Sequence, residues 1–186
     1  MPILGKEPEI HPEDLFSRPE TGIEEGRQWW ALYTLSRREK ELMRRLRALK
    51  VSFYCPIMAH RQRSPAGRIR TSYLPMFTNY VFLYGSADDR YQAFTTNCVS
   101  RDIPVAEGAL LTRDLKQIHS LIEAGVPLRP ESRLEAGESV CVRSGTFRGY
   151  EGFIVRREGE TRLLVAVNFL QQGASLLLDD CEVEPV

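Results

Sequence analysis

Residues 36–50 read SRREKELMRRLRALK, and this stretch decides the fold predicted for the first half of the chain. Ser36 and Glu39 have the S-x-x-E spacing of a capping box, so a helix is predicted over residues 37–50. At the helical repeat, one face is apolar and contains Leu42, Met43, Leu46 and Leu49. The opposite face carries Arg37, Arg38, Lys40, Arg44 and Arg45. One face can therefore be buried in a core while the other presents positive charge.

The positive charge extends beyond this helix, although the chain as a whole is neutral. Residues 27–73 carry twelve Lys or Arg against two Asp or Glu, whereas residues 1–26 carry two against seven. Residues 131–186 are also acidic, with six basic and ten acidic side chains. We expect such a segregated basic segment to face a polyanion. The alternative, a merely solvated helix face, is less favoured because only Glu39 and Glu41 are acidic within the helix.

Apolar and aromatic runs around the basic helix predict an antiparallel sheet. Strands are expected at 29–35, 51–58, 75–84 and 99–105, and further helices at 86–94 and 113–124. Between the second and third strands, Arg61, Arg63, Arg68 and Arg70 alternate around a Pro-Ala-Gly tip, as on the outward face of a β-ribbon arm. This order of elements predicts an α+β fold with helices packed on an antiparallel sheet.

The remaining segments complete the predicted domain organisation. Residues 1–26 are rich in proline and acids and are predicted to be a disordered, solubilising tail, although their acids could instead cover the basic face when nucleic acid is absent. Residues 27–124 form the first domain, and residues 125–136, with two prolines, form a linker. Residues 137–186 alternate short strands with glycine-containing turns, which predicts a small β-barrel domain.

The sequence contains no pattern typical of catalysis or of a bound cofactor. The three histidines stand apart, and no nucleophile–base set, carboxylate pair or phosphate loop occurs, so no enzyme is expected. The four cysteines lack a C-x-x-C pair, which argues against a metal site. Cys55, Cys98 and Cys141 lie in apolar runs and are expected as reduced core residues of a cytoplasmic protein. No apolar run reaches membrane-spanning length.

Two patterns in the sequence resemble the NusG family of transcription elongation factors. Residues 29–33, WWALY, precede the basic helix, and residues 74–82, LPMFTNYVF, are similar to the family's L-P-L-F-P-G-Y-V-F. Residues 140–154 resemble a KOW motif through Val140, Val142, Gly145, Phe147, Gly149, Gly152 and Ile154. The order of the two patterns, with a proline-containing linker between them, is that of the family. The resemblance implies a C-terminal SH3-like β-barrel, the KOW domain.

The resemblance also implies a non-catalytic factor that binds RNA polymerase. In the family, the N-terminal domain sits on the clamp helices of the largest polymerase subunit, and the matching positions are Tyr33, Phe77, Tyr80 and Phe82. Aromatic residues at these positions would also suit an ordinary core.

The family's basic helix lies towards upstream DNA and the non-template strand, and the matching residues are Arg37, Arg38, Arg44 and Arg45. The arm adds Arg61 and Arg63 as candidates. The implied action is suppression of pausing, including antitermination.

The C-terminal domain is implied to recruit a second partner, either a ribosomal small-subunit protein or the termination factor Rho. The candidate contacts are Phe147, Phe153 and Phe169.

Asn79 stands where the family pattern has glycine. In this respect the sequence resembles the specialised, RfaH-like paralogues, some of which hide the polymerase site under a refolded C-terminal domain. The alternative function is a general RNA- or ribosome-binding module. A ribosomal role predicts a basic C-terminal half, whereas this half is acidic.

Overall fold

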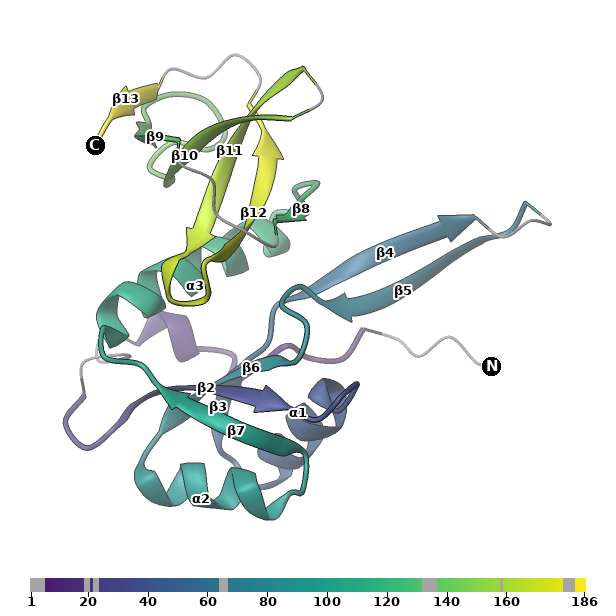
Figure 1. Cartoon of the computed structure of the whole chain (residues 1–186), viewed down its shortest axis with the longest axis vertical. Coiled ribbons are helices and arrows are strands. Elements are labelled where there is room, and N and C mark those ends of the chain that lie inside the picture. Colours follow the sequence, from purple (N-terminus) through teal and green to yellow (C-terminus); the bar gives the residue numbers. More distant parts are fainter. Residues whose placement is uncertain are drawn as a thin grey trace. The chain divides into compact units, whose positions relative to one another are not determined.

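The computed structural model describes residues 6–18, 21, 24–63, 67–131, 137–157, 159–178 and 183–186, and the chain divides into two compact units (Figure 1). The N-terminal unit spans Met1–Ala109 and the C-terminal unit spans Leu110–Val186. Helices and antiparallel sheets occur in the same chain, so the fold class is α+β, as predicted. None of the helices in the described part of the chain is long and apolar enough to cross a membrane.

Five antiparallel strands form the sheet of the N-terminal unit, in the order β1-β3-β6-β2-β7. Their bounds are Ile10–His11 (β1), Gln28–Thr34 (β2), Ser52–Tyr54 (β3), Tyr80–Gly85 (β6) and Val99–Pro104 (β7). The central strand β2 pairs with β6 on one side and with β7 on the other. Because side chains alternate along a strand, Leu32 and Leu83 point to one face of the sheet, and Ala31 and Phe82 point to the other.

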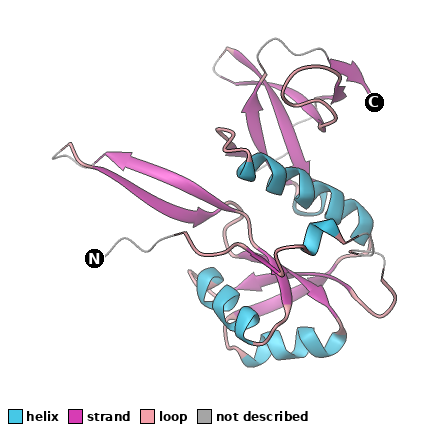
Figure 2. Cartoon of the chain, turned by 180° about the vertical axis from the view of Figure 1, so that it is seen from behind, coloured by secondary structure: helices cyan, strands magenta, loops and turns pink. Residues whose placement is uncertain are grey.

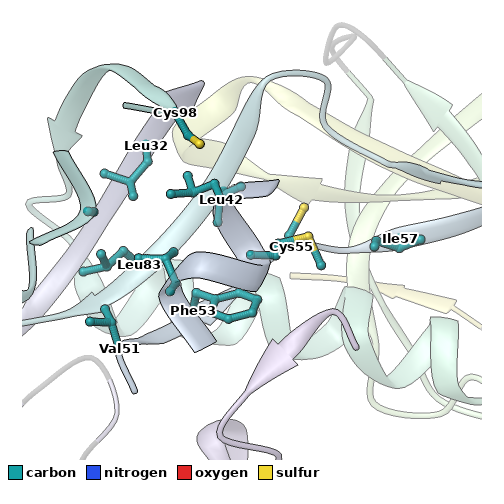
Figure 3. Close-up of a cluster of buried hydrophobic side chains, with 12 residues drawn as sticks. Leu32, Leu42, Val51, Phe53, Cys55, Ile57, Leu83 and Cys98 are labelled. Atoms are coloured by element: carbon teal, nitrogen blue, oxygen red, sulfur yellow. The ribbon is translucent and has the colours of Figure 1, made fainter. Parts of the chain in front are cut away.

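Two helices, α1 (Glu39–Ala48) and α2 (Ala87–Thr95), contribute to the core on the Leu32 face of the sheet, and Figure 3 shows Leu42 of α1 among the buried side chains of this core. The buried cluster there contains Leu32, Leu42, Met43, Leu46, Val51, Phe53, Cys55, Ile57, Val81, Leu83, Ala93 and Cys98. Leu49, expected on the same apolar face of α1, is 42% exposed and is the C-cap residue, one position beyond the end of the helix at Ala48. Burying a leucine-sized side chain contributes about 2 kcal/mol, so this packing fixes α1 and directs its arginine face to solvent.

The N-terminus of α1 differs from the prediction. Arg38 is the N-cap residue and its side chain makes no capping hydrogen bond. Glu39 is 7% exposed, and its Oε1 accepts a hydrogen bond from the backbone N–H of Asn79 at 2.8 Å. The predicted capping box between Ser36 and Glu39 is therefore wrong, because the glutamate carboxylate makes a tertiary contact with the turn before β6.

The N-terminal segment, which we define as residues 6–18, is not a disordered tail. Its strand β1 extends the sheet by pairing with β3, and a short 3-10 helix, η1 (Leu15–Ser17), follows. Leu15 and Phe16 are buried, and the Phe16 ring meets the Tyr54 ring edge to face at 5.0 Å. The prediction of disorder is wrong here because these two apolar side chains cover the sheet face opposite α1. Residues 1–5, 19, 20, 22 and 23 of the predicted tail lie outside the described residues.

Strands β4 (Ile57–Arg63) and β5 (Ile69–Pro75) form a separate two-stranded antiparallel sheet, which we call the ribbon. Figure 1 and Figure 2 show the ribbon projecting from the rest of the N-terminal unit. At its base, Ile57 belongs to the buried core cluster and Tyr73 packs against that cluster. The β-ribbon arm expected from the sequence is therefore present, and its distal side chains are exposed.

Six antiparallel strands form the C-terminal sheet, in the order β13-β9-β10-β11-β12-β8. Their bounds are Arg129–Glu131 (β8), Glu138–Val142 (β9), Glu151–Arg157 (β10), Glu160–Val167 (β11), Gln172–Leu177 (β12) and Val183–Pro185 (β13). Consecutive hairpins connect β9 to β12, as expected for a small barrel-like domain. Cys141 of β9 is half-buried, whereas Cys55 and Cys98 of the first unit are fully buried.

Helix α3 (Gly108–Glu123) belongs mainly to the C-terminal unit. Asp114 Oδ2 accepts hydrogen bonds from the backbone N–H and the side-chain amide of Asn168, at 3.1 and 3.2 Å. Gln117 Oε1 accepts the backbone N–H of Glu151 at 2.9 Å. The compact C-terminal unit therefore includes most of α3, which lies within the predicted first domain of residues 27–124, and part of the expected 125–136 linker is strand β8 of the C-terminal sheet.

Candidate polymerase and nucleic-acid interfaces

The open ends of β2 and β6 bring two tyrosines together. Tyr33 and Tyr80 lie directly opposite each other in the strand register, and their rings meet edge to face with centroids 5.2 Å apart. Both side chains are half-buried, so part of each ring is accessible. The guanidinium of Arg101, on β7, lies 4.9 Å from the Tyr33 ring centroid. We call this accessible pair, with its neighbouring cation, the tyrosine edge.

A turn before β6 holds the tyrosine edge in place. Asn79 has a φ of +65°, in the left-handed region that glycine and asparagine tolerate best. Its N–H donates to Glu39, its carbonyl accepts the N–H of Thr34 at 2.8 Å, and its side-chain amide donates to the Tyr33 hydroxyl at 3.4 Å. Asn79 therefore connects α1, β2 and β6 while adopting the backbone conformation that glycine would adopt there.

Phe77 and Phe82 do not belong to the accessible part of this site. They are 1% and 0% exposed, and their rings pack edge to face with centroids 6.1 Å apart. They offer a partner no surface, contrary to the expectation that they contact polymerase directly. Phe82 points to the same sheet face as Tyr80 but lies within the core. Of the four residues predicted for this contact, the structure leaves Tyr33 and Tyr80 accessible.

The arginines of α1 are exposed, but two of them share a carboxylate of their own helix. Arg45 Nη2 lies 2.7 Å from Glu41 Oε1, and Arg38 Nη1 donates a hydrogen bond to Glu41 Oε2. Arg38 and then Arg45 lower the pKa of the Glu41 carboxyl through these hydrogen bonds, so this carboxylate is charged at neutral pH. Arg37, which precedes the helix with a φ of +61°, makes no ion pair with any described residue.

The N-terminal segment engages two more cations of α1. Arg44 Nη1 lies 3.0 Å from Glu7 Oε1, and Arg47 Nη2 donates to the backbone carbonyl of Pro8 at 2.7 Å. The Arg47 guanidinium also lies 5.8 Å from the centroid of the Phe53 ring. The acidic segment therefore covers part of the basic face, as the second of the two sequence-based alternatives anticipated. The field that α1 presents to a polyanion is correspondingly weaker than the sequence suggests.

The arginines of the ribbon have a different environment. Arg61 and Arg63 are exposed and make no ion pair with a described residue, and the sequence has no Asp or Glu between residues 57 and 75. Gln62 lies opposite Arg70 in the register. Because opposite residues share a face and consecutive residues alternate, Arg61 and Arg63 project from one face and Arg70 from the other. The expected single outward face of arginines is therefore wrong: the cations occupy both faces of the ribbon.

The three phenylalanines expected to bind a second partner lie on three different elements of the C-terminal unit. All three are half-buried. Phe147 lies in the loop before β10 and lines a cavity of about 690 Å³ together with Val126, Pro127, Leu128 and Leu177. Phe153 lies in β10 and Phe169 in the 3-10 helix η2 (Asn168–Leu170). Burial raises the pKa of Asp114, which holds η2 through its hydrogen bonds to Asn168.

Sequence reasoning overlooked the contributions of Glu39, Asn79 and Arg101 to the tyrosine edge. Arg101 lies opposite Tyr33 in the β2–β7 register, so correct strand pairing would have located it. No comparable signal identifies Glu39, because its contact with Asn79 joins residues far apart in the chain. Among the described residues, no three His, Cys, Asp or Glu side chains come together in a way that could hold a metal ion.

Comparison with models of protein families matches residues 27–124 to NusG, described as "Transcription termination factor nusG". This match covers more than half of the chain, and the chain belongs to the NusG family of transcription elongation factors. A solved structure titled "Crystal Structure of MjSpt4:Spt5 complex conformation B" is 14% identical over 86% of this chain and 98% of that chain, with a TM-score of 0.26. Comparison with curated protein sequences gives no match.

Proposed function

We propose that this protein binds RNA polymerase through the clamp helices of the largest subunit and contacts upstream or non-template DNA, thereby suppressing pausing and termination. The tyrosine edge is the observation that carries the proposal. It presents aromatic surface and a cation on a rigid sheet, within the residues matched by the family model. Such a combination suits a protein surface of mixed apolar and acidic character, because aromatic residues and arginine dominate the energetics of protein interfaces.

The DNA contact uses cations of the same unit. Arg61, Arg63 and Arg70 on the ribbon, together with Arg37 before α1, supply guanidinium groups that bind phosphate. A unit that holds polymerase at its tyrosine edge and DNA at its arginines bridges the two and stabilises the closed elongation complex. The protein's role in this mechanism is binding, without a catalytic step, and its site of action is the cytoplasm.

The C-terminal unit serves as a separate docking module. We assign it the role of a KOW domain that recruits either a ribosomal small-subunit protein or Rho. Its cavity beside Phe147 combines apolar residues (Val126, Pro127, Leu128 and Leu177) with polar and charged ones (Arg129, Thr146, Glu160 and Arg162), which suits a partner side chain with an apolar body and a polar end. Phe153 and Phe169 supply further contact surface because each is only half-buried.

Retention on core RNA polymerase after nuclease treatment tests the polymerase contact. Tyr80→Ala removes half of the tyrosine edge and is expected to weaken binding about tenfold, which corresponds to about 1.4 kcal/mol. Tyr91→Ala is the matched control, since Tyr91 is a 69% exposed tyrosine on α2 in the same unit. Unchanged retention of Tyr80→Ala would contradict the proposed contact. Association of the wild type with ribosomes and not with polymerase would contradict the proposal and favour a ribosome-binding module.

A further inference from the structure

We infer that the ribbon enters the major groove of duplex DNA and contacts the phosphates of both strands. This inference rests on the proposed DNA-binding function and specifies the form of nucleic acid that the ribbon recognises. The features that carry it are the distribution of the ribbon's cations, its dimensions and the polar side chains between its arginines.

The cations lie on both faces of the ribbon. A protein surface that lies flat against a nucleic acid needs cations on one face only. Here Arg61 and Arg63 project from one face, and Arg70, opposite Gln62 in the register, projects from the other. A groove has a phosphate backbone on each side, so an element inserted into it meets negative charge on both of its faces. The absence of Asp and Glu from residues 57–75 leaves this approach without like-charge repulsion.

The dimensions of the ribbon fit the major groove of B-form DNA. That groove is about 12 Å wide and about 8.5 Å deep, and it admits a two-stranded β-ribbon. Strands of seven residues are about 23 Å long, so the ribbon is longer than the groove is deep. The minor groove, about 6 Å wide, and the deep, narrow major groove of A-form RNA are too narrow for it. The geometry therefore favours duplex DNA over duplex RNA.

The side chains between the arginines suit contact with base edges. Gln62 and Ser72 are exposed, and Thr71 is half-buried. Amide and hydroxyl groups hydrogen-bond to base edges in the major groove. Ile69 is 71% exposed and can contact the methyl group of thymine. The ribbon thus combines phosphate contacts with groups capable of reading sequence.

The ribbon is also held at its base, which limits the entropy lost when it binds. Ile57 is buried in the core cluster, Tyr73 packs against that cluster, and the backbone N–H of Met76 donates to the Pro56 carbonyl at 2.8 Å. Seven residue pairs join the two strands in continuous antiparallel register. A ribbon pre-organised in this way loses less conformational freedom on binding than a flexible loop of equal charge.

Binding of the full-length protein to three short probes tests the inference: a DNA duplex, one of its single strands and the RNA duplex of the same sequence. The variants are Arg61→Gln/Arg63→Gln for one face of the ribbon and Arg70→Gln for the other. Arg148→Gln, in the C-terminal unit, is the control.

We expect the DNA duplex to bind tightest of the three probes and each ribbon variant to bind this duplex severalfold more weakly than the wild type does. The magnitude of the slope of log K against log salt should fall by about 0.9 for each arginine removed. Methyl green, a major-groove ligand, should compete, whereas netropsin, a minor-groove ligand, should not.

Equal affinity for the duplex and the single strand, or unchanged duplex binding by Arg70→Gln, would overturn the inference, because the ribbon would then lie against the nucleic acid with one face. Polymerase retention separates this failure from failure of the proposed function. If the ribbon variants and the wild type are retained equally on polymerase while the duplex prediction fails, only the inference is wrong. If Tyr80→Ala is retained like the wild type, the polymerase contact is wrong whatever the ribbon binds.

Discussion

The basic face of α1 and the ribbon have similar numbers of arginines but very different surroundings. On α1, Glu41 lies between Arg38 and Arg45, and Glu7 pairs with Arg44. On the ribbon, no acidic residue occurs in the sequence between residues 57 and 75. A phosphate that approaches α1 must compete with carboxylates already in place, whereas a phosphate that approaches Arg61, Arg63 or Arg70 meets no ion pair of these side chains with a described residue. Equal charge in a sequence therefore does not mean equal charge available for binding.

The N-terminal segment contributes to this difference because its Glu7 pairs with Arg44. Weakening the packing of this segment on the sheet is expected to have the largest effect of the changes considered, measured as a loss of folding stability. Phe16→Ala removes a buried ring that contacts Tyr54 and Trp29, and we expect it to destabilise the N-terminal unit by about 3 kcal/mol. Urea unfolding measures this loss. Ser17→Ala, at an exposed position of the same 3-10 helix, is the control. A loss of less than about 0.5 kcal/mol would mean that the segment does not pack on the sheet.

Removing one carboxylate should make α1 resemble the ribbon more closely. Glu7→Gln leaves the Arg44 guanidinium without its charged partner, so Arg44 becomes available to a phosphate. We expect DNA affinity to rise severalfold and the magnitude of the salt slope to increase by up to about 0.9. Glu25→Gln, an exposed glutamate of the same unit, controls for the change in net charge alone. If both variants bind DNA equally well, the Glu7–Arg44 pair does not restrain α1.

The smallest effect concerns pH. The pKa of His11 in β1 lies below its ordinary value of 6.5, mainly because the side chain is partly buried and also because the positive charges of Arg47 and Arg18 are nearby. The unfolded chain therefore binds more protons than the folded chain as the pH falls below 6.5, and stability is lost over that range. Unfolding measured across this interval should show the decrease in the wild type. His11→Asn should show a weaker pH dependence, and an identical pH dependence in the two proteins would exclude His11 as its source.

Local patterns in the sequence predicted much of the N-terminal fold. The strand at Trp29, the apolar face of α1 and the arginine-rich arm follow from short-range periodicity, which depends on neighbouring residues. Glu39 shows the limit of such reasoning. Its spacing from Ser36 fits a capping box, yet its carboxylate accepts the N–H of Asn79, forty residues away. A capping box does form at α2, between Ser86 and Asp89.

The errors in the predicted sites have a common physical cause. Phe77 and Phe82 were grouped with Tyr33 and Tyr80 because all four match the polymerase-binding positions of the family, but tertiary packing buries the phenylalanines and leaves the tyrosines accessible. The N-terminal segment was predicted to be disordered from its average composition, which conceals the buried pair Leu15 and Phe16. Composition and local pattern cannot show which of several similar side chains will be covered by distant parts of the chain.

The comparison between α1 and the ribbon is tested most directly by the salt dependence of duplex DNA binding in two matched double variants. Arg61→Gln/Arg63→Gln and Arg44→Gln/Arg45→Gln each remove two positive charges. We predict that the ribbon variant lowers the magnitude of the salt slope by about 1.8 and that the α1 variant lowers it by clearly less. An equal or larger decrease for the α1 variant would contradict the account, because it would show that Arg44 and Arg45 of the helix, and not Arg61 and Arg63 of the ribbon, carry the contact with DNA.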